Sequence, residues 1–207
     1  MVNHDGTLPA TGSPHTSPVL KFPSTTAGEH LGEASLRVLI DESAVRQGVE
    51  RLAREIISDY EPRPLTILGV MTGSLVLLAD LIRQLDLQIR VGVIQASSYR
   101  GGTVRGELVI DDRWMPEIEG HEVLLVDDIF DTGHTLDKIV KRIRVRQPKS
   151  VRSAVLLTKL GRSEVQIKPD YSVFEIPDEF VVGYGLDYQD EYRHLPHIAV
   201  LEAADLA

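Results

Sequence analysis

Short runs of apolar residues alternate along this chain with segments in which apolar residues recur every three or four positions. The apolar runs are strand-like and cover residues 36–40, 65–70, 89–96, 122–126 and 151–157. The segments between them predict amphipathic helices over 45–60, 75–85 and 135–146. Strands that are apolar throughout are typical of a parallel sheet covered on both faces. The sequence therefore predicts an α/β fold, with a parallel twisted sheet flanked by helices.

The two ends of the chain differ from this alternating part. Residues 1–33 are crowded with Gly, Pro, Ser, Thr and His and show no apolar period. Burial then cannot offset the entropy of ordering them, so we predict a flexible tail followed by one domain over 34–207. After Lys159 the chain has short β-prone pieces, prolines and aromatics without a helical pattern. We expect a small subdomain there, mainly 159–200 plus the first strand, over one end of the sheet.

Composition narrows the classes of function. The formal net charge is −9, which speaks against a broad binding surface for nucleic acid or anionic membrane. The absence of cysteine excludes disulfides, thiolate metal sites and cysteine nucleophiles. No apolar run approaches the roughly 20 residues that span a bilayer, and the N-terminal residues lack a signal-peptide pattern. We expect a cytoplasmic protein that binds neither nucleic acid nor membrane.

The segment 123–135, with the sequence VLLVDDIFDTGHT, carries most of the chemistry. An apolar strand leads into Asp127 and Asp128, and an Asp-Thr-Gly loop that begins at Asp131 precedes a helix. The N-terminus of a helix suits a phosphate, whereas paired carboxylates suit sugar hydroxyls or magnesium carrying a pyrophosphate. The pattern indicates a ribose 5-phosphate ligand with a pyrophosphate leaving group. In the alternative interpretation, the aspartates only cap the strand and the helix.

This segment resembles the phosphoribosyl-pyrophosphate signature of type I phosphoribosyltransferases. Residues 70–74 resemble the family's short first loop, which contacts pyrophosphate, and Ser98-Tyr99 resembles the start of its mobile second loop. Residues 168–188 resemble the carboxy-terminal subdomain, or hood, of hypoxanthine-guanine phosphoribosyltransferases. The resemblance covers about 36–202. It implies the type I phosphoribosyltransferase fold and an enzyme of purine salvage that makes IMP or GMP and pyrophosphate.

The same resemblance implies substrates, a cofactor and an assembly. The substrates would be phosphoribosyl pyrophosphate and a 6-oxopurine base, hypoxanthine or guanine. The cofactor would be Mg²⁺, and the assembly a homodimer or homotetramer. Two alternatives stay open, which are a regulatory protein that senses phosphoribosyl pyrophosphate and an enzyme for xanthine or another base.

Roles for individual residues follow only from the resemblance. Asp127 and Asp128 would hold the ribose hydroxyls directly or through magnesium, and Asp131, near purine N7, would be the catalytic acid/base. The residues that would bind the 5-phosphate are Asp131, Thr132, Gly133, His134 and Thr135. Those that would bind pyrophosphate are Met71, Thr72, Gly73, Ser98, Tyr99 and Arg193.

The purine would be bound by four further residues. Lys159 would reach its 6-oxygen, Phe180 would stack on its ring, Val181 would offer its backbone, and Asp187 would complete this group. Asp187 would also ligate magnesium, together with Asp127 and Asp128. Without the resemblance, Lys159 would be interpreted as the solvated end of a strand and Phe180 as a residue of the hydrophobic core.

Three positions depart from the family pattern. Asp127 stands where many members have the longer Glu, and His134 where some relatives have Lys. A neutral imidazole would give a phosphate less electrostatic help than an ammonium does. The glycine-containing loop 99–106 differs in detail, although its glycines fit either a mobile lid or a flexible hairpin.

Overall fold

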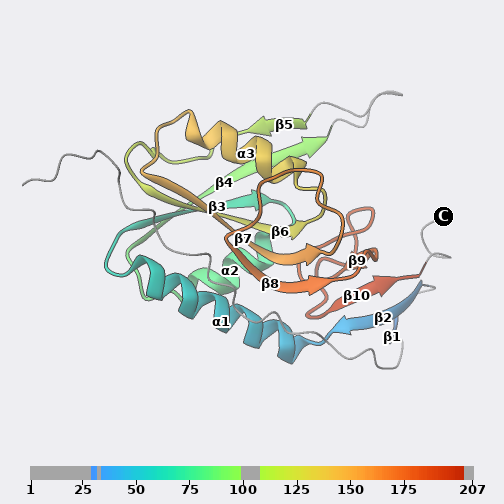
Figure 1. Ribbon diagram of the computed structural model, residues 1–207. Helices are drawn as coiled ribbons and strands as arrows, with labels where there is room; N and C mark the ends of the chain where they lie inside the picture. Colours follow the sequence, from blue (N-terminus) through green and yellow to red (C-terminus); the bar gives the residue numbers. More distant parts are fainter. Residues whose placement is uncertain (1–28, 32–33, 99–107, 203–207) are drawn as a thin grey trace, which may run out of the picture.

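A computed structural model describes residues 29–31, 34–98 and 108–202 of the chain. Two sheets and three helices make up this part (Figure 1). The helices are α1 (Glu42–Tyr60), α2 (Leu75–Ile82) and α3 (His134–Arg144). The strands are β1 (Glu29–Leu31), β2 (Ala34–Ile40), β3 (Leu65–Met71), β4 (Ile89–Ser98), β5 (Leu108–Asp111), β6 (Glu122–Phe130), β7 (Ser150–Lys159), β8 (Tyr171–Ile176), β9 (Val181–Val182) and β10 (Ile198–Leu201).

The larger sheet has six strands in the order β5-β4-β3-β6-β7-β8. All neighbouring pairs run parallel except β4 and β5. Helices α1 and α2 cover one face and α3 covers the other (Figure 1). Alternate strand residues serve the two faces: Leu124 belongs to the core on the α1 side, and Leu125 to the core on the α3 side. The predicted α/β fold with a covered parallel sheet is confirmed.

Helix α1 begins and ends as its sequence predicts. The Asp41 side chain accepts a hydrogen bond from the backbone N–H of Ala44 at 2.8 Å, which caps the first turn. The apolar stripe from Val45 to Tyr60 is buried. Pro62 follows directly after the C-cap residue Glu61 and cannot continue the helix.

Strand β6 is longer than predicted and contains both adjacent aspartates. We expected the strand to end at Val126, but it runs to Phe130 because β7 lies beside it over this whole length. Ile129 pairs with Leu157, and Phe130 with Thr158. The loop before α3 is therefore only three residues long, 131–133.

The segment after Lys159 is divided between the two sheets. We expected 159–200 in the hood, yet Tyr171–Ile176 pairs in parallel with β7 as a sixth strand. Its buried Val173 and Phe174 pack so closely against α1 that a Cβ at Gly48 would lie 2.4 Å from Val173. This burial explains why the strand joins the main sheet. Edge strand β5 was not predicted. It has only four residues, most of them half-buried, and apolar and polar residues do not alternate in it.

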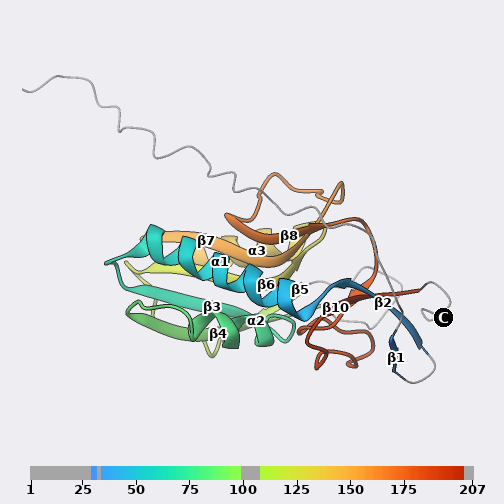
Figure 2. The ribbon, with the colours of Figure 1, turned by 90° about the horizontal axis from the view of Figure 1, so that it is seen from below.

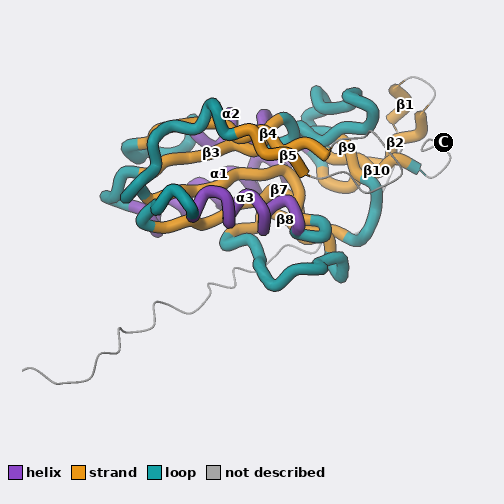
Figure 3. The backbone as a smooth tube through the Cα atoms, turned by 90° about the horizontal axis from the view of Figure 1, so that it is seen from above, coloured by secondary structure: helices purple, strands orange, loops and turns teal. Residues whose placement is uncertain are grey.

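The smaller sheet combines both ends of the described chain in the order β1-β2-β10-β9. It lies beyond the carboxyl ends of the parallel strands (Figures 2 and 3). Glu29–Leu31, which we placed in the flexible tail, pairs with β2 as β1. Residues 1–28 and the whole loop 99–106, Tyr99 included, lie outside the described residues. Within the described ranges, no helix is both long and apolar enough to cross a membrane.

Candidate functional site

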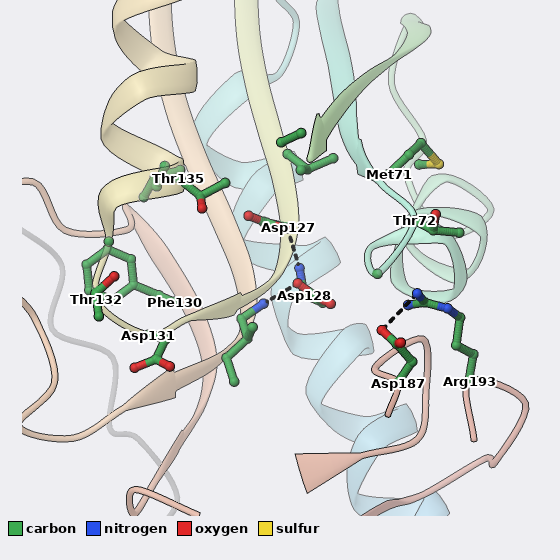
Figure 4. Close-up of a pocket in the computed structure, with 16 residues that line it drawn as sticks. Met71, Thr72, Asp127, Asp128, Phe130, Asp131, Thr132, Thr135, Asp187 and Arg193 are labelled. Carbon is green, nitrogen blue, oxygen red and sulfur yellow. Dashed lines mark hydrogen bonds and ion pairs between the residues drawn. The ribbon is translucent and has the colours of Figure 1, made fainter. Parts of the chain in front are cut away.

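A cavity of about 340 Å³ opens where β3 and β6 end and α3 begins (Figure 4). It faces the hood, so residues from both sheets' loops reach it. The residues that line it are Val70, Met71, Thr72, Gly73, Ala96, Asp127, Asp128, Ile129, Phe130, Asp131, Thr132, Gly133, Thr135, Leu136, Asp187 and Arg193. Most of the residues expected at the phosphates and the ribose thus come together in one place.

Asp127, which is buried, and Asp128, which is half-buried, form the acidic floor of the cavity. Asp127 is only 7% exposed, and its Oδ1 accepts a hydrogen bond from the Asp128 N–H at 3.0 Å. Burial, followed by the neighbouring Asp128 charge, raises the pKa of Asp127 well above its ordinary value. Burial also raises the pKa of Asp128, although Arg193 acts in the opposite direction. Two adjacent carboxyls with raised pKa values would be stabilised as anions by a cation or by hydroxyl donors.

The loop 131–133 leads into α3 through a left-handed glycine. Gly133 has a φ of 86°, which a residue with a side chain rarely adopts, and a Cβ there would lie 2.4 Å from Val165. Thr132 and Thr135 border the cavity on either side of it (Figure 4). The first N–H groups of a helix have no intrahelical partner. This end of α3 therefore offers backbone and hydroxyl donors to an anion.

On the opposite wall, the loop 71–73 touches the hood. A Cβ at Gly73 would lie 1.7 Å from Asp128 Oδ2, so a side chain at this position would displace that carboxylate. A Cβ at Gly185 would lie 2.2 Å from the Gly73 carbonyl oxygen. Arg193 donates to the Gly185 carbonyl at 2.7 Å and pairs with Asp187 at 2.8 Å (Figure 4). The wall thus presents a guanidinium and a carboxylate side by side.

The carboxylates could share a metal only with ligands from elsewhere. Within the described residues, no group of three or more Asp, Glu, His or Cys side chains could hold a metal ion. Magnesium, however, is usually bound by one or two carboxylates together with substrate phosphates and water. Asp127, Asp128 and Asp187 border one cavity and supply oxygen ligands of the required type. The residues fit magnesium that arrives with a phosphorylated substrate.

Other predicted site residues do not line the cavity. Lys159 lies outside it, with Nζ 3.6 Å from Asp131 Oδ2, and its side chain is 11% exposed. Phe180 packs edge-on against Tyr188, with ring centroids 5.5 Å apart, and Val181 is buried in β9. Ser98 ends β4, but its side chain lies outside the described part of the structure.

His134 is directed away from the cavity. Its Nε2 lies 2.8 Å from Glu164 Oε2, and both side chains are about half exposed. The imidazole therefore faces a carboxylate of the segment that follows β7. Of the five residues expected at the 5-phosphate, His134 is the one whose side chain does not border the cavity.

Sequence reasoning overlooked Arg162, which contacts Asp131, and Asp178, which contacts Arg162. Arg162 Nε lies 2.8 Å from Asp131 Oδ1, and its Nη1 lies 3.5 Å from Asp178 Oδ2. Arg162 stands in a stretch without apolar periodicity, and its partner is 31 positions away. Only the parallel pairing of β6 with β7, which aligns the loops that follow them, could have indicated the contact.

Comparisons with known proteins agree with this geometry. The pattern of the family described as phosphoribosyl transferase domain matches residues 39–189. The hypoxanthine-guanine phosphoribosyltransferase of Bacillus subtilis (strain 168) is 40% identical over 169 residues, which cover 81% of this chain and 94% of that protein. The crystal structure of a hypoxanthine phosphoribosyltransferase from Staphylococcus aureus is 36% identical, has a TM-score of 0.77, and is matched over 82% of this chain and 93% of that chain.

Longer relatives contain a matching part. The bifunctional protein TilS/HprT of Listeria monocytogenes serovar 1/2a is 40% identical over 167 residues, which are 80% of this chain. The match spans only 26% of that longer protein. Together with the family pattern and the Bacillus relative, these similarities show that the chain belongs to the phosphoribosyltransferase family.

Proposed function

We propose that this protein is a 6-oxopurine phosphoribosyltransferase of purine salvage. It transfers the ribose 5-phosphate of phosphoribosyl pyrophosphate to hypoxanthine or guanine, which gives IMP or GMP and pyrophosphate. The observation that carries the proposal is the single cavity in which the acidic pair of β6, the start of α3 and the Asp187–Arg193 pair meet. The 40% identity with a hypoxanthine-guanine enzyme over most of both chains supports the choice of base.

Asp127 and Asp128 would hold the ribose hydroxyls, and with Asp187 they would hold magnesium. Bound magnesium supplies positive charge that neutralises the leaving pyrophosphate. The raised pKa of both carboxyls supports such a role, because an arriving cation would favour their ionised forms.

The phosphates would occupy the two walls of the cavity. The 5-phosphate would lie at the start of α3 against Thr132, Gly133 and Thr135, where N–H groups and the positive end of the helix dipole favour an anion. Pyrophosphate would lie against the 71–73 loop and Arg193. Both groups would then be held by positioned donors while the charge of the ribosyl cation-like state develops.

The base would enter between Asp131 and the hood. Lys159 would donate to the purine 6-oxygen, Phe180 would stack on the ring, and Val181 would offer backbone groups. Asp131 borders the cavity beside the start of α3, where it would exchange a proton with purine N7.

We further propose that 34–207 acts as one domain and that the enzyme works in the cytoplasm as a homodimer or homotetramer. The contact of the 71–73 loop with Gly185 supports one continuous unit. The cysteine-free, acidic composition is compatible with that location. Sedimentation of the purified chain at several concentrations tests the assembly.

The function is tested by a nucleotide-forming assay with phosphoribosyl pyrophosphate, magnesium and a panel of bases. We expect turnover with hypoxanthine and guanine and almost none with adenine, because Lys159 has donors only and would face the adenine amino group donor to donor. Lys159→Met should remove most activity toward both bases. Lys141→Met is the matched control, since Lys141 also pairs with an aspartate, at 2.7 Å, but on the exposed face of α3.

The outcomes of this assay separate the alternatives. Turnover with adenine equal to that with hypoxanthine would contradict the role of Lys159. Turnover with xanthine alone would favour an enzyme for that base. Tight binding of phosphoribosyl pyrophosphate without turnover on any base would favour a sensor.

The role of Asp131 gives a second prediction. Asp131→Asn should lower the rate of the chemical step by roughly 10²–10⁴-fold, the usual contribution of a general acid/base. Single-turnover kinetics measure this step, while donor affinity should change far less. A near-normal single-turnover rate would leave Asp131 with only a structural role in its loop.

A further inference from the structure

Two cations and two carboxylates form a closed cluster at the edge of the cavity. Lys159 Nζ lies 3.6 Å from Asp131 Oδ2 and 3.4 Å from Asp178 Oδ1. Arg162 contacts the other oxygen of each carboxylate, at 2.8 Å from Asp131 Oδ1 and 3.5 Å from Asp178 Oδ2. Each carboxylate is thus shared by the same two cations, and the four formal charges sum to zero.

Arg162 is held in this cluster by its neighbours in the chain. The Glu164 N–H donates to the Thr132 carbonyl at 3.0 Å. The Glu164 carboxylate contacts His134, and Val165 packs against Gly133. The segment 162–165 therefore lies along the whole loop that carries Asp131.

The shortest contact of Asp131 with a cation of the cluster is with Arg162, not with Lys159. The hydrogen bond with Asp131 raises the pKa of Arg162 above its already high ordinary value, so the guanidinium stays charged. Without Arg162, Lys159 alone would face two carboxylates. Its ammonium would then be drawn toward them and away from an incoming base.

We propose that Arg162 is a positioning residue that neutralises Asp131 and Asp178 and so keeps Asp131 and Lys159 available to the purine. This inference rests on the proposed function, since it concerns the two residues assigned to the base. It implies that Arg162 matters through charge balance in the cluster and not through contact with substrate.

The test compares steady-state kinetics of Arg162→Gln, Arg162→Lys and the double variant Arg162→Gln/Asp178→Asn. For Arg162→Gln we expect kcat/KM for hypoxanthine to fall about 10- to 100-fold, the scale of effect of a small misplacement of reacting groups. The KM for phosphoribosyl pyrophosphate should stay within about twofold, because the Arg162 side chain contacts Asp131 and Asp178 and none of the groups proposed to hold the phosphates. Arg162→Lys keeps the charge and should retain most of the activity.

The double variant tests whether Arg162 acts by neutralising charge or only by holding the loop 131–133 in place. Removing the Asp178 charge leaves Lys159 opposite Asp131 alone, so activity toward hypoxanthine should recover above that of Arg162→Gln. A bracing role alone would give no recovery. Arg142→Gln is the control, because Arg142 also pairs with an aspartate, at 3.1 Å, away from the cavity.

Three results would overturn the inference while leaving the proposed function intact. They are unchanged kinetics in Arg162→Gln, a loss without recovery in the double variant, and a loss shared equally by the donor KM. Wild-type protein that forms no nucleotide with any purine would instead refute the proposed function itself, and the inference with it.

Discussion

At the scale of single residues, Asp127 and Asp128 of the site lower the stability of the folded protein when they are ionised. Asp127 is buried and the adjacent Asp128 is half-buried, and among the described residues neither has an ion pair as close as the one between Asp131 and Arg162. Desolvation raises the pKa of both carboxyls. A side chain whose ionisation is opposed by the fold destabilises the protein wherever it is forced to ionise. The site would recover this cost only when magnesium and ribose hydroxyls bind.

Asp127→Asn tests this cost through stability. A raised pKa in the folded state stabilises the protein fully below the unfolded value, near 3.9, and this stabilisation is lost as the pH rises through the folded value. Asn cannot ionise and can still accept the Asp128 N–H with its side-chain oxygen. The variant should therefore have a higher Tm than wild type at pH 7–8, by roughly 2–4 °C for each 1 kcal/mol. The gain should shrink toward about pH 4.

Thermal unfolding followed by circular dichroism across this pH range measures the difference. Asp190→Asn serves as the control, because its side chain is 95% exposed and should show no such gain. The Asp127 variant should also bind the donor more weakly. Equal or lower stability at pH 8 would show that Asp127 is not destabilising in the free protein.

At the scale of elements, the sequence predicted those helices and strands that local signals determine. It predicted less well the strand ends and strands that depend on pairing with distant parts of the chain. Helix α1 was predictable because its cap and its apolar stripe are local. The continuation of β6 through two aspartates was not, because it depends on pairing with β7. Placement of β8 also depends on a distant partner, since Val173 and Phe174 are buried by contact with Gly48 of α1.

The candidate site divides in the same way. The residues of 127–135 are contiguous, so one motif indicated half of the residues that line the cavity. Asp187 and Arg193 were indicated only by resemblance, since the hood brings them beside the 71–73 loop. Arg162 was missed, because charge pairing across 31 positions leaves no periodic signal.

One contact between elements should control how the hood is placed on the main sheet. The buried Tyr184 hydroxyl donates to Asp80 Oδ2 of α2 at 2.6 Å, next to the contact of Gly185 with Gly73. Burial and the Asp80 hydrogen bond raise the pKa of Tyr184, which keeps the hydroxyl protonated as a donor. Tyr184→Phe should cost about 1 kcal/mol of unfolding free energy. It should also weaken donor binding, because Arg193 and Asp187 depend on the same hood loop.

Urea unfolding and donor titration measure the two effects. Asp80→Asn is the matched control, since its side-chain oxygen can still accept from Tyr184, and it should cost less. Loss of stability without any change in donor affinity would mean that the Tyr184–Asp80 contact does not control the pyrophosphate wall.

At the scale of the whole molecule, the hood is built from both ends of the described chain. β2, close to the N-terminal end, pairs with β10, close to the C-terminal end, and β10 pairs with β9. The main sheet instead comes from the residues between them. Folding of the hood therefore requires contacts of long sequence separation, which we expect to form more slowly than local ones. The cavity, which is lined mainly by the main sheet and its loops and is completed by Asp187 and Arg193 of the hood, is formed only when both parts are in place.

The last prediction concerns where the N-terminal tail ends. Residues 1–28 lack a pattern that burial could stabilise, whereas Glu29–Leu31 pairs with β2. Deletion of 1–28 should leave Tm and turnover unchanged. Deletion of 1–33 removes β1 and leaves β2 as the sheet edge, so Tm should fall, by roughly 2–4 °C if the pairing is worth about 1 kcal/mol. Paired melting curves and turnover assays of the two truncations decide the matter. A large loss on removal of 1–28 would show that this segment packs on the domain, and equal stability of both truncations would show that β1 contributes nothing.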